Sequence, residues 1–154
     1  MRTKSLLNPT DKQESLQRLQ RLTVDSRPLW GKMSAHQMIC HLADSFRAAT
    51  GEKGASPATN FFNRTVVKWI ALQTPMRWPK GVKTRPEMDQ LIGGTKPIEF
   101  EIDRKILLEL IERFTASKRD FLWSAHPLFG EMNELEWLRW GYLHLDHHLR
   151  QFGL

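Results

Sequence analysis

Apolar residues recur every three or four positions in four long segments of this chain. No other feature of the sequence limits the possible folds as much. Such a repeat matches the turn of an α-helix. The predicted helices cover about residues 8–22, 35–50, 103–125 and 133–152. Each starts at a side chain suited to an N-cap: Asn8 or Thr10, Ser34, Asp103 and Asn133. Two of these caps also have a glutamine or glutamate three residues later, which completes a capping box.

The remaining segments connect these helices. Residues 56–73 predict a shorter, partly β-branched helix, and residues 74–98 form a long connection rich in proline and glycine. A brief alternation in "KPIEFEI" would give a lone strand without a partner, so no sheet is expected. The pattern predicts an all-α fold, an antiparallel four-helix bundle with an extra short helix and a long loop between the second and third main helices. The chain length of 154 residues suits one domain, residues 1–154.

Composition excludes several classes of protein. No apolar run approaches the ~20 residues that span a bilayer, and the basic N-terminus lacks the apolar stretch of a secretory signal. A cytoplasmic protein without a membrane partner is therefore expected. The only cysteine, Cys40, excludes an intrachain disulfide and a cysteine-rich zinc site, and we expect it to be a buried, inert thiol. The net charge of +6 is spread along the chain, so nucleic acid is not an expected partner.

Three of the six histidines crowd the end of the last predicted helix, in "HLDHHL". His144 and His148 are one turn apart, beside the apolar stripe of that helix. The stripe comprises Leu135, Leu138, Tyr142, Leu145, Leu149 and Phe152. On the second helix His41 borders the core stripe, whereas His36 points to the polar side. Two imidazoles at this spacing can reach one metal ion, and an inward His41 would supply a third ligand.

Small residues beside these histidines indicate room for a ligand. Ser45 and Ala48 lie beside His41, and Gly141 lies beside His144, where a plain core would carry leucine or isoleucine. Three inward imidazoles without partners would be costly to bury, and a metal ion would remove that cost. Three neutral imidazole ligands with open coordination positions are typical of a catalytic metal site and suit zinc, nickel, iron or copper.

The segments "MSAHQMICHLADSF" and "HPLFGEMNELEWLRWGYLHLDHHLRQFG" resemble the DinB/YfiT-like superfamily of metal-binding four-helix bundles. The resemblance runs from about Leu29 to the end and is closest to an uncharacterised bacterial branch classed as a domain of unknown function. The superfamily carries one ligand histidine on its second helix and two, four residues apart, on its last main helix. This pattern implies His41, His144 and His148 as ligands of a divalent transition metal such as zinc, nickel or iron.

Relatives in this superfamily imply two activities. Some are transferases or isomerases that use a low-molecular-weight thiol, whose sulfur the metal would bind as the thiolate that attacks an electrophilic small-molecule substrate. Others resemble metal-dependent hydrolases, in which the metal lowers the pKa of bound water toward ~7. The residues do not separate these enzymes from each other, or from a non-catalytic metal-binding or stress-associated interaction protein. They also leave open whether the chain forms a homodimer.

Polar residues near the three histidines are candidates for supporting them. Asp44, one turn after His41, would either orient an imidazole or lie solvated. Gln151 could play a similar part beside His148. His147 is expected to support the site, and the alternative is that it replaces one ligand of the last helix.

Residues outside the histidine turns are candidates for a pocket. Trp137 shares the face of His144 and would wall the site. Lys80 and Lys83, in "RWPKGVKTR", would hold an anionic group of a substrate or thiol if the long loop covers the metal, and would otherwise be solvated. His126, in "HPLFG", is expected to form a turn far from His144.

Overall fold

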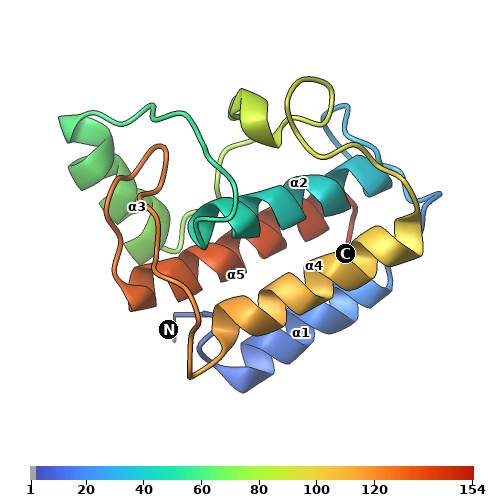
Figure 1. Cartoon of the computed structure of the whole chain (residues 1–154), viewed down its shortest axis with the longest axis horizontal. Coiled ribbons are helices and arrows are strands. Elements are labelled where there is room, and N and C mark those ends of the chain that lie inside the picture. Colours follow the sequence, from blue (N-terminus) through green and yellow to red (C-terminus); the bar gives the residue numbers. More distant parts are fainter. Residues whose placement is uncertain (1–2) are drawn as a thin grey trace.

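The computed structural model describes residues 3–154, which form five α-helices and no β-strand (Figure 1). Four helices are long: α1 (Pro9–Gln20), α2 (Ala35–Ala49), α4 (Phe100–Thr115) and α5 (Glu134–Gln151). The short α3 (Lys68–Gln73) continues a π-helical turn, η1 (Asn63–Val67). A 3-10 turn, η2 (Pro86–Met88), interrupts the long connection before α4. The all-helical prediction is confirmed.

Local capping explains where three of the long helices begin. Asn8 caps α1 through its side chain, while Ser34 and Asn133 form complete capping boxes with Gln37 and Glu136 at the starts of α2 and α5. These side chains satisfy amide groups that have no partner within the helix. The predicted starts of these helices are therefore confirmed.

The start of α4 differs from the prediction. Its cap is Glu99, whose carboxylate accepts hydrogen bonds from the amides of Glu101 and Ile102. Asp103 lies within the first turn and accepts a hydrogen bond from Nε2 of His36, 2.7 Å away. The helix therefore begins before Asp103, which was predicted to be its cap.

The end of α4 also differs, because the helix stops at Thr115 instead of continuing to about residue 125. Beyond it, Trp123 stacks on Trp137 with 5.7 Å between ring centroids and an interplanar angle of 15°. The amide of Ser124 also donates to the carbonyl of Ala49 over 2.9 Å. These tertiary contacts hold the segment outside the helical conformation that its sequence favours locally.

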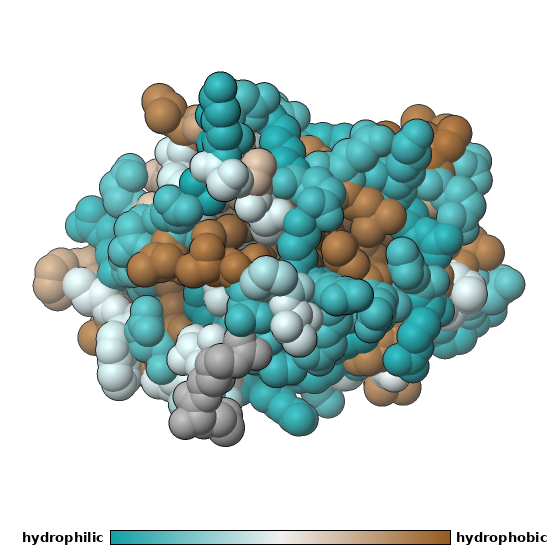
Figure 2. Space-filling view, turned by 90° about the horizontal axis from the view of Figure 1, so that it is seen from below, coloured by the Kyte–Doolittle hydropathy of each residue, from teal (hydrophilic) through white to brown (hydrophobic). Residues whose placement is uncertain are grey.

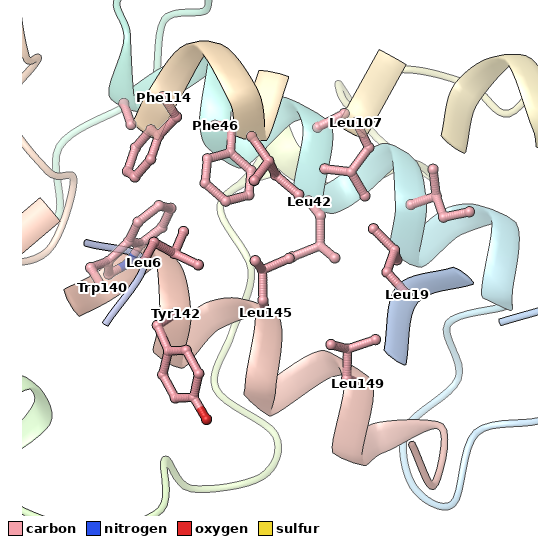
Figure 3. Packing of buried hydrophobic residues seen from close by; sticks show 14 of the residues in the cluster. Leu6, Leu19, Leu42, Phe46, Leu107, Phe114, Trp140, Tyr142, Leu145 and Leu149 are labelled. Carbon is pink, nitrogen blue, oxygen red and sulfur yellow. The ribbon is translucent and has the colours of Figure 1, made fainter. Parts of the chain in front are cut away.

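The long helices meet in one hydrophobic core. α2 packs against both α4 and α5, and α1 packs against α5 (Figure 1). In Figure 3, Leu42 of α2 and Leu145 of α5 point toward one another, and Leu107 of α4 lies nearby. This packing fixes α2 relative to α5, the two helices that carry the candidate metal ligands. Within residues 3–154, no helix combines the length and the apolar character needed to cross a bilayer.

One residue predicted to be in the core lies at the surface. Leu135 has 64% of its area exposed, whereas Leu138, Leu145 and Leu149 on the same helix are almost fully buried. Leu135 sits in the first turn of α5, about 60° from the centre of the apolar stripe. The prediction for Leu135 was wrong, because residues 3–154 leave this end of the stripe uncovered.

The turn before α5 is organised by His126. Its Nδ1 atom accepts hydrogen bonds from the amides of Leu128 and Phe129, both over 3.1 Å, and its ring stacks on that of Phe129. The backbones of His126 and Gly130 exchange two further hydrogen bonds of 2.8 Å. Burial lowers the pKa of this imidazole to about 3. The ring is therefore neutral and carries its hydrogen on Nε2.

Two leucines on α5 test the placement of the core. Leu145→Ala should lower the free energy of unfolding by about 3 kcal/mol, because the buried side chain leaves a cavity. Leu135→Ala, the matched control on the same helix, should change it by less than about 0.5 kcal/mol. Urea denaturation followed by circular dichroism measures both values. Equal losses in the two variants would contradict the packing described above.

The buried His126 predicts a pH dependence of stability. Since its pKa is lower in the folded than in the unfolded protein, the unfolded state binds more protons as pH falls below about 6.5, and stability is lost. His126→Asn keeps an acceptor for the turn but removes the ionisable ring. Between pH 7 and 5.5 this variant should lose about 1 kcal/mol less stability than the wild type. Denaturation curves with the same pH slope would show that the ring is accessible to protons in the folded state.

Candidate metal centre

Three histidines from two helices converge at one point. Nε2 of His41 on α2 lies 3.1 Å from Nε2 of His144 on α5. One ring nitrogen from each of His41, His144 and His148 lies within 4.8 Å of the others. A tetrahedral metal with nitrogen ligands at ~2.1 Å separates two of them by about 3.4 Å. The group could therefore hold a metal ion.

Helix geometry and helix packing together produce this convergence. His144 and His148 are four residues apart on α5, so their rings lie on one face of that helix. His41 is brought opposite them because α2 and α5 pack against each other. Ser45, one turn after His41, donates its hydroxyl hydrogen to the carbonyl of His41 over 2.8 Å and makes no bond to the ring.

A main-chain carbonyl orients the ring of His41. Nδ1 lies 3.0 Å from the carbonyl oxygen of Met88 in η2, and a carbonyl can only accept, so Nδ1 carries the hydrogen. Nε2 therefore presents its lone pair toward His144, as a metal ligand requires. The sequence could not identify Met88 as this partner, because every residue has a carbonyl group.

Asp44 does not have either of the roles considered for it. Its carboxylate is fully buried and accepts hydrogen bonds from the amide and hydroxyl of Thr95, over 2.7 and 2.6 Å, and from Gln90 over 3.3 Å. The carboxylate thus binds the long loop instead of an imidazole, and it is not solvated. Since this loop also carries Met88, Asp44 supports the orientation of His41 only indirectly.

Gln151 contacts His148 in the way a supporting residue would. Nδ1 of His148 lies 2.9 Å from Oε1 of Gln151, while the amide nitrogen of Gln151 donates to the carbonyl of Trp30 over 3.0 Å. Nδ1 of His148 is then the donor, which leaves the lone pair of Nε2 free for a metal. Gly31 is required beside this contact, because its φ is +77° and a Cβ atom there would lie 2.8 Å from Gln151.

His147 lies outside the group of three histidines that could hold a metal ion. Its ring is near Trp30 and Trp78, with centroid distances of 6.0 and 6.3 Å, and is in edge contact with His148. Its Nδ1 atom is buried and has no hydrogen-bond partner among residues 3–154. This position is adjacent to the triad without taking part in it.

A cavity of about 500 Å³ opens on the three histidines. Ser45 and Ala48 line it, in agreement with the expected space beside His41. Gly141 does not line it: a Cβ atom there would meet Leu6 at 2.8 Å and Phe114 at 3.0 Å. The expectation for Gly141 was wrong, because this glycine admits core side chains and not a ligand.

The other expected pocket residues have different positions. Trp137 lines the cavity although its side chain is almost fully buried, and Lys83 lies on the wall formed by the long loop. Lys80 instead stacks over the ring of Trp30, with Nζ 4.5 Å from its centroid. Of the two lysines, the structure therefore brings only Lys83 to the cavity.

His126 lines the cavity together with Trp140, so the expectation that it lies far from His144 was wrong. Trp140 contacts His144 with 4.8 Å between centroids, and His126 contacts Trp140 at 5.7 Å. The Nε2–H group of His126 has no acceptor in the described part of the chain, so it is available to a ligand in the cavity. A helical wheel would find Trp140, one turn before His144, but no sequence signal brings His126 to this wall.

Burial keeps the triad in the form that binds metals. It lowers the pKa of His41, and it lowers the pKa values of His144 and His148 well below the usual value for histidine. For His144, the neighbouring imidazoles of His148 and His41 lower the pKa further. Neutral imidazole is the form that ligates a metal, so these shifts favour metal binding near neutral pH.

A second group of potential ligands lies on the other side of α2, where His36, Cys40 and Asp103 approach one another within 4.8 Å. His36 and Asp103 already satisfy each other through their hydrogen bond. Burial raises the pKa of the Cys40 thiol to about 12, as expected for an inert cysteine. These groups are explained as packing and pairing between α2 and α4.

Comparison with known proteins identifies the family of this chain. No curated protein and no solved structure matches it significantly. One family, described as "Protein of unknown function (DUF1569)", matches residues 1–153. This match includes all three histidines of the candidate centre. The chain therefore belongs to the DUF1569 family.

Proposed function

We propose that this protein is a metal-dependent enzyme related to the DinB/YfiT-like superfamily. In this proposal residues 1–154 form one domain, an antiparallel four-helix bundle, and His41, His144 and His148 bind a divalent transition metal such as zinc, nickel or iron. The contacts of α2 with α4 and α5, and of α1 with α5, support a bundle. Two links between α1 and α4, Lys12 to Glu112 and Arg104 to the carbonyl of Gln20, would close it.

One observation carries this proposal: three neutral imidazoles share a cavity wall, and two of them have their outer nitrogens bound. Met88 and Gln151 accept those hydrogens, which directs the Nε2 lone pairs of His41 and His148 inward. Such partners are typical of metal-ligating histidines, because they fix the tautomer and the orientation of the ring. Any buried imidazole N–H needs an acceptor, so the feature that favours a metal is that the two remaining Nε2 lone pairs converge beside His144.

The cavity favours an enzyme over a non-catalytic metal-binding or stress-associated interaction protein. A structural zinc site is usually closed by four protein ligands, whereas a catalytic site has three and an open position. Here the three histidines border a space of about 500 Å³, which is in the range of small-molecule sites. A substrate bound there would lie directly against the ligands.

The chemistry of the cavity wall favours thiol transfer over hydrolysis. A bound metal would lower the pKa of a thiol that ligates it, so the thiolate would form without a protein base. Metal-dependent hydrolysis of the zinc-peptidase type also uses a glutamate as general base. Among residues 3–154 that line the cavity, none is an aspartate or glutamate.

The remaining wall residues have roles that fit a thiol cofactor and an apolar substrate. Lys83 and Arg85 line the cavity and would attract a carboxylate of the thiol. Trp78 and Trp140 provide aromatic faces for an apolar group next to His144. His126 would donate its Nε2–H to a substrate oxygen, since its Nδ1 is already occupied by the turn.

The metal site predicts the effect of removing single histidines. His41→Ala, His144→Ala and His148→Ala should each abolish the binding of one equivalent of zinc or cobalt that the wild type retains after dialysis. Elemental analysis gives the stoichiometry. His36→Ala is the matched control, because this residue lies on α2 one turn before Cys40 and is paired with Asp103. It should retain the full equivalent.

A wild-type protein that takes up no zinc, cobalt, nickel or iron while correctly folded would refute the metal site. Loss of metal in His36→Ala as well would point to a general folding defect. Circular dichroism of each variant separates this defect from the loss of a ligand.

Thiol binding distinguishes transfer from hydrolysis. Adding glutathione to the cobalt-loaded protein should produce a sulfur-to-cobalt charge-transfer band in the near ultraviolet. Lys83→Ala should weaken glutathione binding roughly fivefold, through loss of one charge-assisted contact, and leave 2-mercaptoethanol binding unchanged. Lys105→Ala, remote on α4, is the control. A spectrum that responds to neither thiol, together with ester or amide hydrolysis by the loaded protein, would favour the hydrolase instead.

A further inference from the structure

The segment from residue 55 to 85, here called the basic segment, carries the whole net charge of the chain. It contains six of the 23 lysines and arginines and none of the 17 aspartates and glutamates, while the chain has a net charge of +6. Its cations are Arg64, Lys68, Arg77, Lys80, Lys83 and Arg85. The rest of the chain is therefore neutral overall, and the positive field of the protein originates at this segment.

The basic segment also exposes an apolar helix face. Residues 61–73 are continuously helical, through η1 and α3, and follow Asn60, whose side chain accepts from the amide of Asn63 over 2.8 Å. Phe62, Val66 and Trp69 are spaced four and three residues apart and have 58%, 43% and 62% of their areas exposed. This spacing places them on one face of the helix.

Neighbouring residues enlarge this apolar face. Phe61 is 75% exposed, and Met76, in the loop that follows, is 62% exposed. In Figure 1, α3 lies at one end of the molecule, and Figure 2 shows apolar atoms reaching the surface at that end. The opposite side of the same segment packs inward: Leu72 is fully buried, and Val67 and Ala71 line the histidine cavity. A solvent-facing stripe of this kind is unfavourable in water and marks a binding surface.

Charge decides which partner fits this surface. No carboxylate among residues 3–154 forms an ion pair with Arg64, Arg77 or Lys83, so these cations are available. A second copy of the chain would bring an equally positive segment against the first, and the like charges would repel. A nucleic acid would neutralise the charge, and single-stranded bases could stack on Phe62 and Trp69, but it would leave Val66 and Met76 uncovered. An anionic membrane surface satisfies both features, because its headgroups attract the cations and its acyl chains accept the apolar face.

We propose that the exposed face of residues 61–73, flanked by the cations of the basic segment, binds the surface of an anionic lipid membrane. The helix lies in the plane of the interface, with Phe62 and Trp69 entering the acyl region and Arg77 near the headgroups. Aromatic residues beside basic ones are the composition that such interfacial helices use. This inference does not depend on the metal centre, since the exposed face points away from the cavity wall.

Sedimentation with lipid vesicles tests the proposal on the full chain. The protein should bind vesicles of phosphatidylcholine mixed with phosphatidylglycerol, and bind phosphatidylcholine alone much more weakly. Raising the salt concentration should weaken the binding, because it screens the headgroup charge. The double variant Phe62→Ser, Trp69→Ser should bind roughly tenfold less tightly. The single variant Arg77→Gln should bind roughly fivefold less tightly.

Matched controls come from another part of the surface. Leu122, which is 89% exposed, and Lys105 on α4 lie outside the basic segment, so Leu122→Ser and Lys105→Gln should bind as the wild type does. Circular dichroism checks that every variant is folded. Equal binding to both kinds of vesicle, or none to the anionic kind at low salt, would overturn the proposal. Self-association that the Phe62→Ser, Trp69→Ser variant abolishes, or binding to duplex DNA instead of vesicles, would equally overturn it.

Discussion

The packing of α2 against α5 is the contact on which the candidate centre depends. Leu42 and Phe46 of α2 share the core with Leu145 and Leu149 of α5. Because these side chains fill the space between the helices, the two backbones are held at one distance and one rotation. His41 borders the same face of α2 as Leu42 and therefore meets the histidines of α5. The core thus sets the geometry of the polar site beside it.

The long connection before α4 links two helices and also makes hydrogen bonds that organise the site. Asp44 of α2 binds Thr95 and Gln90 from this loop, and the loop returns the carbonyl of Met88 to Nδ1 of His41. A buried carboxylate in such a position is stabilised by several hydrogen bonds at once. The tautomer of His41, and with it the direction of its lone pair, therefore depends on a segment with almost no regular structure. A loop of this length in a compact protein is often functional, and here it closes one side of the cavity.

The basic segment faces two environments at the same time. Val67 and Ala71 look into the cavity, whereas Phe62 and Trp69 look outward. A short helix that is apolar on both sides is not stable by itself in water. This helix remains folded because its inner side packs against the body of the protein. If the outer face meets a membrane, the wall of the cavity and the lipid surface are opposite sides of one short helix.

The helices and the three histidines could be predicted from the sequence, because capping and the helical repeat involve residues that are close in sequence. Ser34 with Gln37, and the four-residue spacing of His144 and His148, are signals of this kind. The end of α4 at Thr115 was not accessible, because the stacking of Trp123 on Trp137 decides it.

The sequence by itself determined which faces of the helices are apolar and which imidazoles border them. Only the tertiary structure decided that Met88 and Gln151 hold two of those rings, that Asp44 binds a loop instead, and that His126 joins the cavity wall. The physical reason is that most of these contacts depend on the path of a loop or on the orientation of one hydrogen bond. Gln151 is the exception, because its spacing from His148 made it a candidate in the sequence. Such contacts have no period in the sequence, whereas the burial of a helix face does.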